Sequence, residues 1–207
     1  MKKVAVISYH KNIEALYPKA WIDRHRKSVL DQTYKDFDIY ELDYGGGQER
    51  IFAESYFLSK EFPTFIDAMN YLLDKLKDYD AVANLNSDDW YDVKRLEIQL
   101  PYIEQGFDIV SSNFALIKNN KEVLRHSFHN LDIASELIRG NNIIAHPSVV
   151  YSKKFIETLR YDPNEIPVED MILWMRCLIK QLRIKIVPEC LLFHIIHENS
   201  VCSSNNR

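Results

Sequence analysis

The chain has 207 residues, of which 46% are hydrophobic, and its formal net charge is −4 at pH 7. A chain of this length and apolar content can bury a sizeable core as one domain. The mildly negative charge argues against a broad nucleic-acid surface, and no run of about 18 apolar residues suggests a membrane-spanning helix. We therefore expect one globular domain with no nucleic-acid partner and no transmembrane segment, in an oligomeric state that the sequence leaves open.

The cysteines and the N-terminal residues indicate the cellular compartment of the protein. Cys177, Cys190 and Cys202 are odd in number and lack the paired spacing of a zinc site. The apolar run that follows Met1-Lys2-Lys3 is too short for a signal peptide. The sequence thus predicts a cytoplasmic protein with reduced cysteines, the first two of them in the core, and it leaves room for peripheral membrane contact.

Short apolar runs alternate with helical patterns over the first 117 residues. A βαβ alternation of this kind predicts a mainly parallel sheet with helices on both faces. A glycine-rich loop, "YGGGQ", follows the second run. The expected strands are 3–9, 37–43, 80–86 and 107–117. The expected helices are 19–32, which follows Pro18, then 63–76, and 93–105, which is broken near Pro101. The second of these helices has an apolar stripe of Ile66, Met69, Leu73 and Leu76.

The second half has a more mixed pattern. Residues 123–128 are expected to form a hairpin with the fourth strand, and Gly140 is expected to cap a short helix. Pro188 suggests an edge or a bend in the last strand. The expected elements are a helix over 133–139, a strand over 142–152, a helix over 167–181 and an extended segment over 183–196.

Two pairs of neighbouring acids are the candidate chemical groups. Asp88 and Asp89 follow the third expected strand, at the edge where open parallel sheets bind ligands. Carboxylates there could hold Mg²⁺ or Mn²⁺ together with substrate phosphates, or they could simply cap the next helix. Glu169 and Asp170 begin a helix, where acids are also favoured by the helix dipole. His197 follows the last apolar run, and a lone histidine there could be structural.

The order of the motifs resembles the family 2 glycosyltransferases, which have the GT-A fold. The resemblance rests on six segments that occur in the family's order and span nearly the whole chain. They are "VAVISYHKN", "SVLDQTYKDFDIYELDYG", "LNSDDWYDVKRLE", "AHPSVVYSKKFIE", "VEDMILWMR" and "HIIHENSVCS". The resemblance implies a single catalytic domain over 1–207, with a nucleotide-sugar-binding half in 1–117 and an acceptor-side half with a small antiparallel lobe in 118–207.

The family's residue roles follow by position. In that family a divalent cation, Mn²⁺ or Mg²⁺, balances the diphosphate that leaves, and a base takes the acceptor's proton. The resemblance implies that Asp89 binds the metal, that Asp88 contacts the donor or shares the metal, and that His197 is a further ligand. It makes Asp170 the general base and Glu169 its neighbour. Tyr9, Lys11, Asp43 and Tyr44 would surround the nucleotide.

Two departures from the family pattern leave alternatives open. Tyr44 replaces an acid that relatives use near the uracil ring, and Asn86 replaces an acid before the metal site. UDP-sugar is the expected donor, with a glycan, a protein or a lipid-linked molecule as acceptor. The competing interpretations are a nucleotide-sugar-binding protein that has lost turnover and, with less support, a nucleotidyltransferase, since the first strand lacks a basic glycine-rich phosphate loop.

Overall fold

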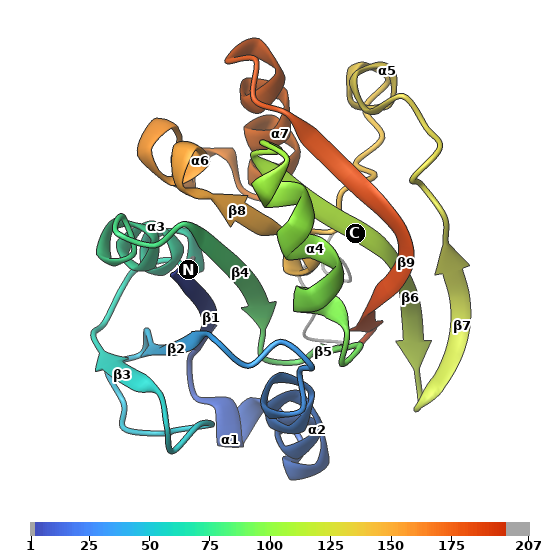
Figure 1. Cartoon of the computed structure of the whole chain (residues 1–207). Coiled ribbons are helices and arrows are strands. Elements are labelled where there is room, and N and C mark those ends of the chain that lie inside the picture. The colour runs from blue at the N-terminus through green and yellow to red at the C-terminus, as the bar shows by residue number, and fades with distance from the viewer. Residues whose placement is uncertain (1–2, 198–207) are drawn as a thin grey trace.

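The computed structural model describes residues 3–197, which form a mixed nine-stranded sheet flanked by helices (Figure 1). The last residues of the expected final motif, 198–203, lie outside the described residues, as do residues 204–207. The strands are β1 (Val4–His10), β2 (Asp38–Asp43), β3 (Tyr56–Ser59), β4 (Ala81–Asn86), β5 (Trp90–Tyr91), β6 (Ile109–Lys118), β7 (Lys121–His126), β8 (Val150–Ser152) and β9 (Ile184–Ile195). The helices are α1 (Ile13–Leu16), α2 (Lys19–Leu30), α3 (Phe65–Lys75), α4 (Arg95–Glu104), α5 (Ile133–Ile138), α6 (Lys153–Thr158) and α7 (Glu169–Ile179), with 3₁₀ turns η1 (His146–Ser148) and η2 (Pro163–Glu165).

The strand order places six carboxyl ends at one edge of the sheet. The order is β3-β2-β1-β4-β8-β6-β9-β5, with β7 paired to β6. The pairings are parallel between β3 and β2, β2 and β1, and β1 and β4, and also between β6 and β9. Strand β8 is antiparallel to both of its neighbours, β4 and β6. Because β8 is inverted, its beginning lies at the edge where the parallel strands end, and it brings η1 to that edge.

Alternate residues of the strands fill two cores, one on each face of the sheet. In β1, Ala5 and Ile7 point to the face covered by α3 and α7, while Val4 and Val6 point to the face covered by α2 and α4. This alternation is the period of two that a strand imposes on its side chains. The expected apolar stripe of α3 is fully buried, and Thr64 caps the helix by accepting a hydrogen bond from the Asp67 amide.

The expected α/β class is confirmed, and so are most of the expected elements. The hairpin of β6 and β7 is present, Gly140 ends α5 with a positive φ of 84°, and Cys177 is fully buried while Cys190 is half-buried. Sequence periodicity alone missed β3, β5, α1 and α6, which are short.

Two expectations about prolines and extents need correction. Helix α4 continues through Pro101, because the burial of Leu96, Leu100 and Ile103 against the sheet holds it together. The expected strand 142–152 is reduced to β8, since Pro147 lies in the 3₁₀ turn before it. Pro188 lies in a register shift of β9 against β6, which agrees with the second of its two expected roles, a bend in the last strand.

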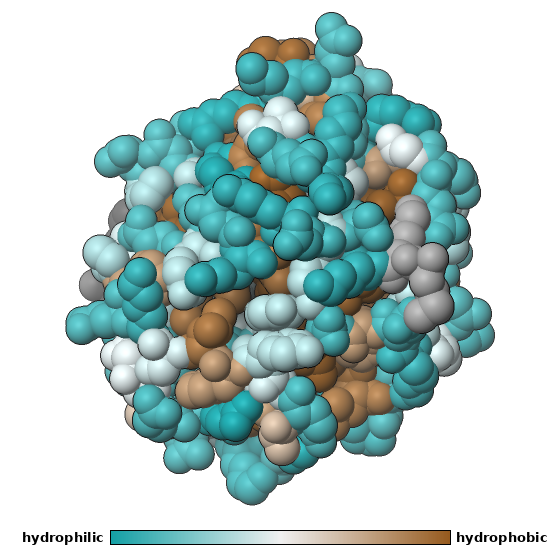
Figure 2. Space-filling model, turned by 60° about the vertical axis from the view of Figure 1, so that its left-hand side comes forward, coloured by the Kyte–Doolittle hydropathy of each residue, from teal (hydrophilic) through white to brown (hydrophobic). Residues whose placement is uncertain are grey.

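None of the helices in residues 3–197 has the length and apolar character needed to cross a bilayer. Hydrophilic residues cover most of the face in Figure 2, with hydrophobic residues set among them.

Candidate active site

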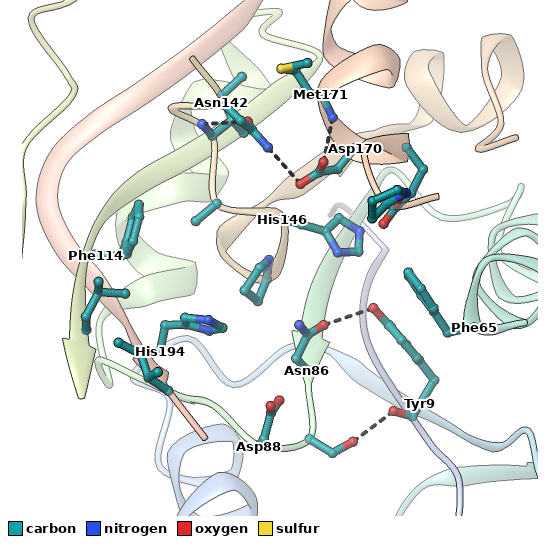
Figure 3. Close-up of a pocket in the computed structure, with 18 of the residues that line it drawn as sticks. Tyr9, Phe65, Asn86, Asp88, Phe114, Asn142, His146, Asp170, Met171 and His194 are labelled. Carbon is teal, nitrogen blue, oxygen red and sulfur yellow. Dashed lines mark hydrogen bonds between the residues drawn. The ribbon is translucent and has the colours of Figure 1, made fainter. Parts of the chain in front are cut away.

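A cavity of about 990 Å³ opens at the carboxyl-terminal edge of the sheet. Its volume lies at the upper end of the range for small-molecule sites. It takes side chains from both halves of the chain, since β1 and β4 supply one wall and α7 another (Figure 3). The polar and aromatic lining residues are Tyr9, His10, Lys11, Tyr17, Tyr44, Phe65, Asn86, Ser87, Asp88, Phe114, Lys118, His126, Asn142, His146, Glu169, Asp170 and His194.

Polar residues at the end of β4 and in the turn after it form the floor of the cavity. Asn86 and Asp88 line the cavity, while Asn84, on the same side of the strand as Asn86, is fully buried. The Tyr9 hydroxyl donates to Asn86 Oδ1 at 2.9 Å, and Ser87 Oγ donates to the Tyr9 carbonyl oxygen at 2.9 Å. Strand alternation therefore directs these polar groups toward the ligand side of the sheet.

Asp88 and His197 meet at one end of the cavity. His197 Nε2 lies 2.9 Å from Asp88 Oδ2, and the His197 ring packs against Tyr17 and Trp21. Among residues 3–197, no group of three or more His, Cys, Asp or Glu side chains is placed to share a metal ion. A carboxylate and an imidazole nevertheless fit a cation whose remaining ligands are substrate phosphates and water, as is usual for Mg²⁺.

The structure buries Asp89, for which the resemblance implies metal binding, outside the cavity lining. Its side chain is completely buried, with His194 Nδ1 at 2.9 Å and 3.1 Å from its two oxygens. The Ile195 amide donates to Oδ1 at 3.0 Å. Burial raises the pKa of the Asp89 carboxyl, and the neighbouring His194 opposes that shift. Asp89 therefore anchors the turn after β4 to β9, and Asp88 is the acid that a ligand can reach.

Glu169 and Asp170 lie across the cavity from Asp88, at the start of α7. Asp170 Oδ2 accepts a hydrogen bond from Asn142 Nδ2 at 2.9 Å, and Oδ1 accepts one from the Met171 amide at 2.7 Å. Glu169 is only 7% exposed, and its Oε2 has no hydrogen-bond partner among residues 3–197. The structure thus brings both acids into one cavity with Asp88, although about 80 residues separate the pairs.

Burial controls the ionisation of this second acid pair. Loss of solvent raises the pKa of Asp170, and the hydrogen bonds from Met171 and Asn142 oppose the shift. Burial also raises the pKa of Glu169, to which the charge of Asp170 adds. The helix N-terminus was expected to favour the ionised form of Asp170, but desolvation outweighs it. A carboxylate with a raised pKa is a stronger proton acceptor.

The expected nucleotide-side residues divide into two groups. Tyr9, Lys11 and Tyr44 line the cavity. Asp43 is buried beneath the glycine loop instead, where its Oδ1 accepts a hydrogen bond from the Gly45 amide at 2.9 Å. A β-carbon on Gly45 would lie 2.9 Å from Lys11 Cγ, so the glycine lets the Lys11 stem pack across the loop.

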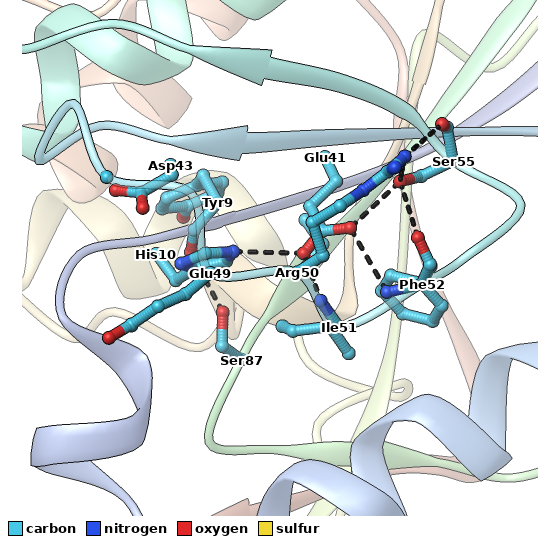
Figure 4. Close-up of polar contacts among 12 residues, drawn as sticks. Tyr9, His10, Glu41, Asp43, Glu49, Arg50, Ile51, Phe52, Ser55 and Ser87 are labelled. Atoms are coloured by element: carbon cyan, nitrogen blue, oxygen red, sulfur yellow. Dashed lines mark hydrogen bonds and ion pairs between the residues drawn. The ribbon is translucent and has the colours of Figure 1, made fainter.

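A buried acid in β2 ties the segment that follows the glycine loop to the sheet (Figure 4). Glu41 is fully buried and accepts hydrogen bonds from the Ile51 amide at 2.5 Å, the Phe52 amide at 3.1 Å and Ser55 Oγ at 2.8 Å. Its Oε1 also lies 3.0 Å from His10 Nε2. These contacts lower the pKa of Glu41 despite its burial, so a charged carboxylate holds the segment after β2 against β1.

Several cavity residues were not expected from the sequence. Asn142 reaches Asp170 from a loop where the sequence predicted the start of a strand, and Phe114 and Lys118 come from the second half of β6. Asn86 had been noted only as a departure from the family pattern. The alternation of Asn84, Asn86 and Asp88 is the one sequence feature that could have revealed the floor of the cavity.

Comparison with known proteins supports an enzyme of sugar transfer. No family model matches the chain. It is 28% identical over 198 residues to the O-antigen biosynthesis glycosyltransferase WbnJ of Escherichia coli, covering 89% of this chain and 78% of that protein. It is 26% identical over 190 residues to MJ1057 of Methanocaldococcus jannaschii, an uncharacterized glycosyltransferase, covering 84% and 66%. The chain is related to glycosyltransferases.

The fold of this chain is also found among solved structures. S. aureus TarS 1–349 in complex with UDP-GlcNAc superposes with a TM-score of 0.75 at 14% identity. The match covers 99% of this chain but only 62% of that one, so the chain spans less than two thirds of the TarS fragment. A second TarS structure, in complex with UDP, gives a TM-score of 0.71 at 13% identity, covering 95% of this chain and 61% of that one. At these identities the likeness concerns the fold.

Proposed function

We propose that this protein is an inverting glycosyltransferase of the family 2, GT-A type, which transfers a sugar from a UDP-sugar to an acceptor hydroxyl. The observation that carries the proposal is the single cavity with Asp88 at one end and the Glu169–Asp170 pair at the other. Inversion requires the leaving group and the attacking hydroxyl on opposite faces of the anomeric carbon, and therefore acids from two separate segments.

In this reaction the acceptor oxygen forms a bond to the anomeric carbon while the bond from that carbon to the diphosphate oxygen breaks. Asp170 takes the hydroxyl proton, and its raised pKa suits it to that role. Asn142 holds the Asp170 carboxylate in place through its 2.9 Å hydrogen bond. Glu169, buried beside it, orients the acceptor through its unpaired oxygen.

Asp88 and His197 would hold Mn²⁺ or Mg²⁺ together with the diphosphate oxygens. When bound, such a cation neutralises the charge that develops on the departing UDP. Lys11 adds positive charge to the same end of the cavity, and the rings of Tyr9 and Tyr44 provide surfaces for the nucleotide. One of the TarS structures is a complex with UDP, which supports UDP as the first nucleotide to test.

The acceptor would bind at the α7 end of the cavity, beside Asn142 and Asp170. The name of WbnJ refers to O-antigen biosynthesis, so a glycan is the first acceptor to test, before a protein or a lipid-linked molecule.

Cys177 and Cys190 are free thiols, which fits a reducing cytoplasmic compartment.

The test is a donor screen of the full chain with and without Mn²⁺. UDP-glucose, UDP-galactose, UDP-GlcNAc and GDP-mannose are each added, and melting temperature and nucleotide release are followed. A ligand at a hundred times its dissociation constant should stabilise the protein by about 2.7 kcal/mol. We expect a UDP-sugar to bind and to be slowly hydrolysed. Binding without any release of UDP would favour an inactive binding protein, and tighter binding of GDP than UDP would overturn the choice of donor.

A further inference from the structure

His146 occupies the floor of the cavity between the two acid ends. Figure 3 shows its ring between Asn86 and Asp88 on one side and Asp170 on the other. It reaches this position because β8 runs antiparallel to β4, so that the preceding turn η1 lies at the carboxyl-terminal edge. The proposed chemistry requires the reacting sugar between the group that leaves toward Asp88 and the base at Asp170.

The His146 side chain is held from behind. Its ring makes edge contacts with Tyr161 at a centroid distance of 5.3 Å, and it packs at 6.4 Å against the fully buried Trp174. Asn84 Nδ2 donates to the His146 carbonyl oxygen at 3.1 Å and lies 3.3 Å from ring Nε2. The ring is therefore fixed before any ligand arrives, which is how a preformed site limits the cost of binding.

The hydrogen-bonding partners of His146 leave one ring nitrogen for a ligand. Asn84 Nδ2 lies 3.3 Å from Nε2 and 3.5 Å from Nδ1, so it can bond to only one of them. Among residues 3–197, no other polar group lies within hydrogen-bond distance of either ring nitrogen, so in either tautomer one nitrogen can bond a hydroxyl, as donor or as acceptor. Burial lowers the pKa of His146 to about 4, which keeps the imidazole uncharged at neutral pH.

We propose that His146 is a specificity-determining residue that hydrogen-bonds a hydroxyl of the transferred sugar of the donor. This inference rests on the proposed function and extends it to the sugar. An uncharged imidazole suits a neutral hydroxyl better than it suits a phosphate, which attracts cationic side chains. The position between Asp88 and Asp170 assigns the contact to the donor sugar rather than to the nucleotide.

The test compares His146→Leu and His146→Asn with the wild type. Leucine keeps similar bulk and removes the hydrogen bond, while asparagine keeps an N–H. Donor hydrolysis without an acceptor and the affinity for free UDP are measured with the best UDP-sugar found in the donor screen. We expect His146→Leu to lower kcat/KM for donor hydrolysis by about 5- to 100-fold, the loss expected for one buried hydrogen bond, with UDP affinity within twofold. His146→Asn should recover part of the loss.

Deoxy donors identify the contact itself. The wild type should discriminate against a donor that lacks the contacted hydroxyl, and His146→Leu should treat that donor and its parent alike. His129→Leu is the control, because His129 contacts Asn113 and lies outside the cavity lining.

Three results would overturn the inference. Unchanged hydrolysis in His146→Leu would remove the donor contact, and equal losses of UDP and UDP-sugar affinity would make the role structural. If His146→Leu still discriminates against each deoxy donor as strongly as the wild type does, another residue makes the contact with the sugar hydroxyl. A wild-type protein that binds no UDP-sugar would overturn the proposed function as well, and that result is seen before any variant is made.

Discussion

At the end of β4, the neighbours Asp88 and Asp89 point to opposite sides, one into the cavity and one into the protein. At the start of α7, the neighbours Glu169 and Asp170 both line the cavity. The backbone explains the difference. Asp88 and Asp89 lie in the turn closed by the hydrogen bond from the Asp89 amide to the Asn86 carbonyl oxygen, which sends their side chains to different sides. Glu169 and Asp170 share the first turn of α7, where successive side chains are separated by only about 100°.

The comparison separates anchoring acids from reactive acids. Asp89 has its oxygens occupied by His194 and the Ile195 amide, so it stabilises the turn that presents Asp88. Asp170 is held by Asn142 and the Met171 amide yet remains on the cavity wall. An acid pair in a sequence therefore signals two reactive groups only when the backbone keeps both on one side.

The largest expected effect is on turnover. Asp170→Asn keeps the size and removes the proton acceptor, so transfer should fall by about 10² to 10⁴ with UDP-sugar affinity within twofold. Steady-state kinetics and calorimetry of the same preparations would measure both. Glu169→Gln is the matched variant, and we expect a smaller loss from it. If that variant collapses while Asp170→Asn retains turnover, the base is Glu169.

The next effect is on stability, and it tests the anchoring role. Asp89→Ala should lower the free energy of unfolding by about 3–5 kcal/mol, because it removes the fully buried partner of the half-buried His194 and of the buried Ile195 amide. Asp88→Ala, one residue away, should cost about 1 kcal/mol or less, since its side chain faces the cavity. Urea denaturation would measure both, and equal losses would contradict the division between the two acids.

Low pH should reduce the stability of the buried contacts around the turn after β4. His25 Nδ1 donates to the Asp89 carbonyl oxygen at 3.0 Å, and burial lowers its pKa to about 4. The unfolded chain binds this proton below about pH 6.5, and the folded protein does not until about pH 4. Stability present above pH 6.5 should therefore be lost as the pH falls toward 4, by up to about 1.4 kcal/mol per unit for each such histidine. His25→Gln should show a shallower slope in urea titrations across that range, and an unchanged slope would argue against a neutral His25.

Substitution of Asp88, the acid that faces the cavity, should weaken metal-dependent nucleotide binding. Asp88→Asn should weaken Mn²⁺-dependent UDP binding by about 10- to 100-fold, which corresponds to about 1.4–2.7 kcal/mol. Binding measured with EDTA should change far less, because the carboxylate acts through the cation. Exposed Asp23→Asn serves as the control. Full Mn²⁺ dependence in Asp88→Asn would exclude Asp88 as a ligand.

The smallest expected effect is a gain in stability. Because burial raises the pKa of folded Asp170, its ionised form destabilises the folded protein above that pKa, and the penalty disappears as the pH falls and the group is protonated. Asp170→Asn should therefore raise the free energy of unfolding at pH 7 by about 0.5–2 kcal/mol, the range typical of such substitutions. Asp23→Asn should stay within about 0.5 kcal/mol of wild type. A loss of stability in Asp170→Asn would mean that the hydrogen bonds of Asp170 outweigh its desolvation.

The sequence by itself determined the elements whose pattern is local. The apolar runs of β1, β2 and β4 and the stripe of α3 are readable because strands and helices impose periods of 2 and 3.6 residues. The order of motifs also indicated the two acid pairs. Local patterns could not show that Asp88 lines the cavity while its neighbour Asp89 is buried, or that both Glu169 and Asp170 line it.

Only the tertiary structure decided what meets in the cavity. The inversion of β8 brings His146 to the ligand edge, Asn142 reaches Asp170 from an irregular loop, and Asp43 lies beneath its glycine turn. These placements depend on strand order and on contacts between residues far apart in the chain, which no window of sequence contains. Desolvation depends on the same packing, so the raised pKa of Asp170 also became visible only in the folded chain.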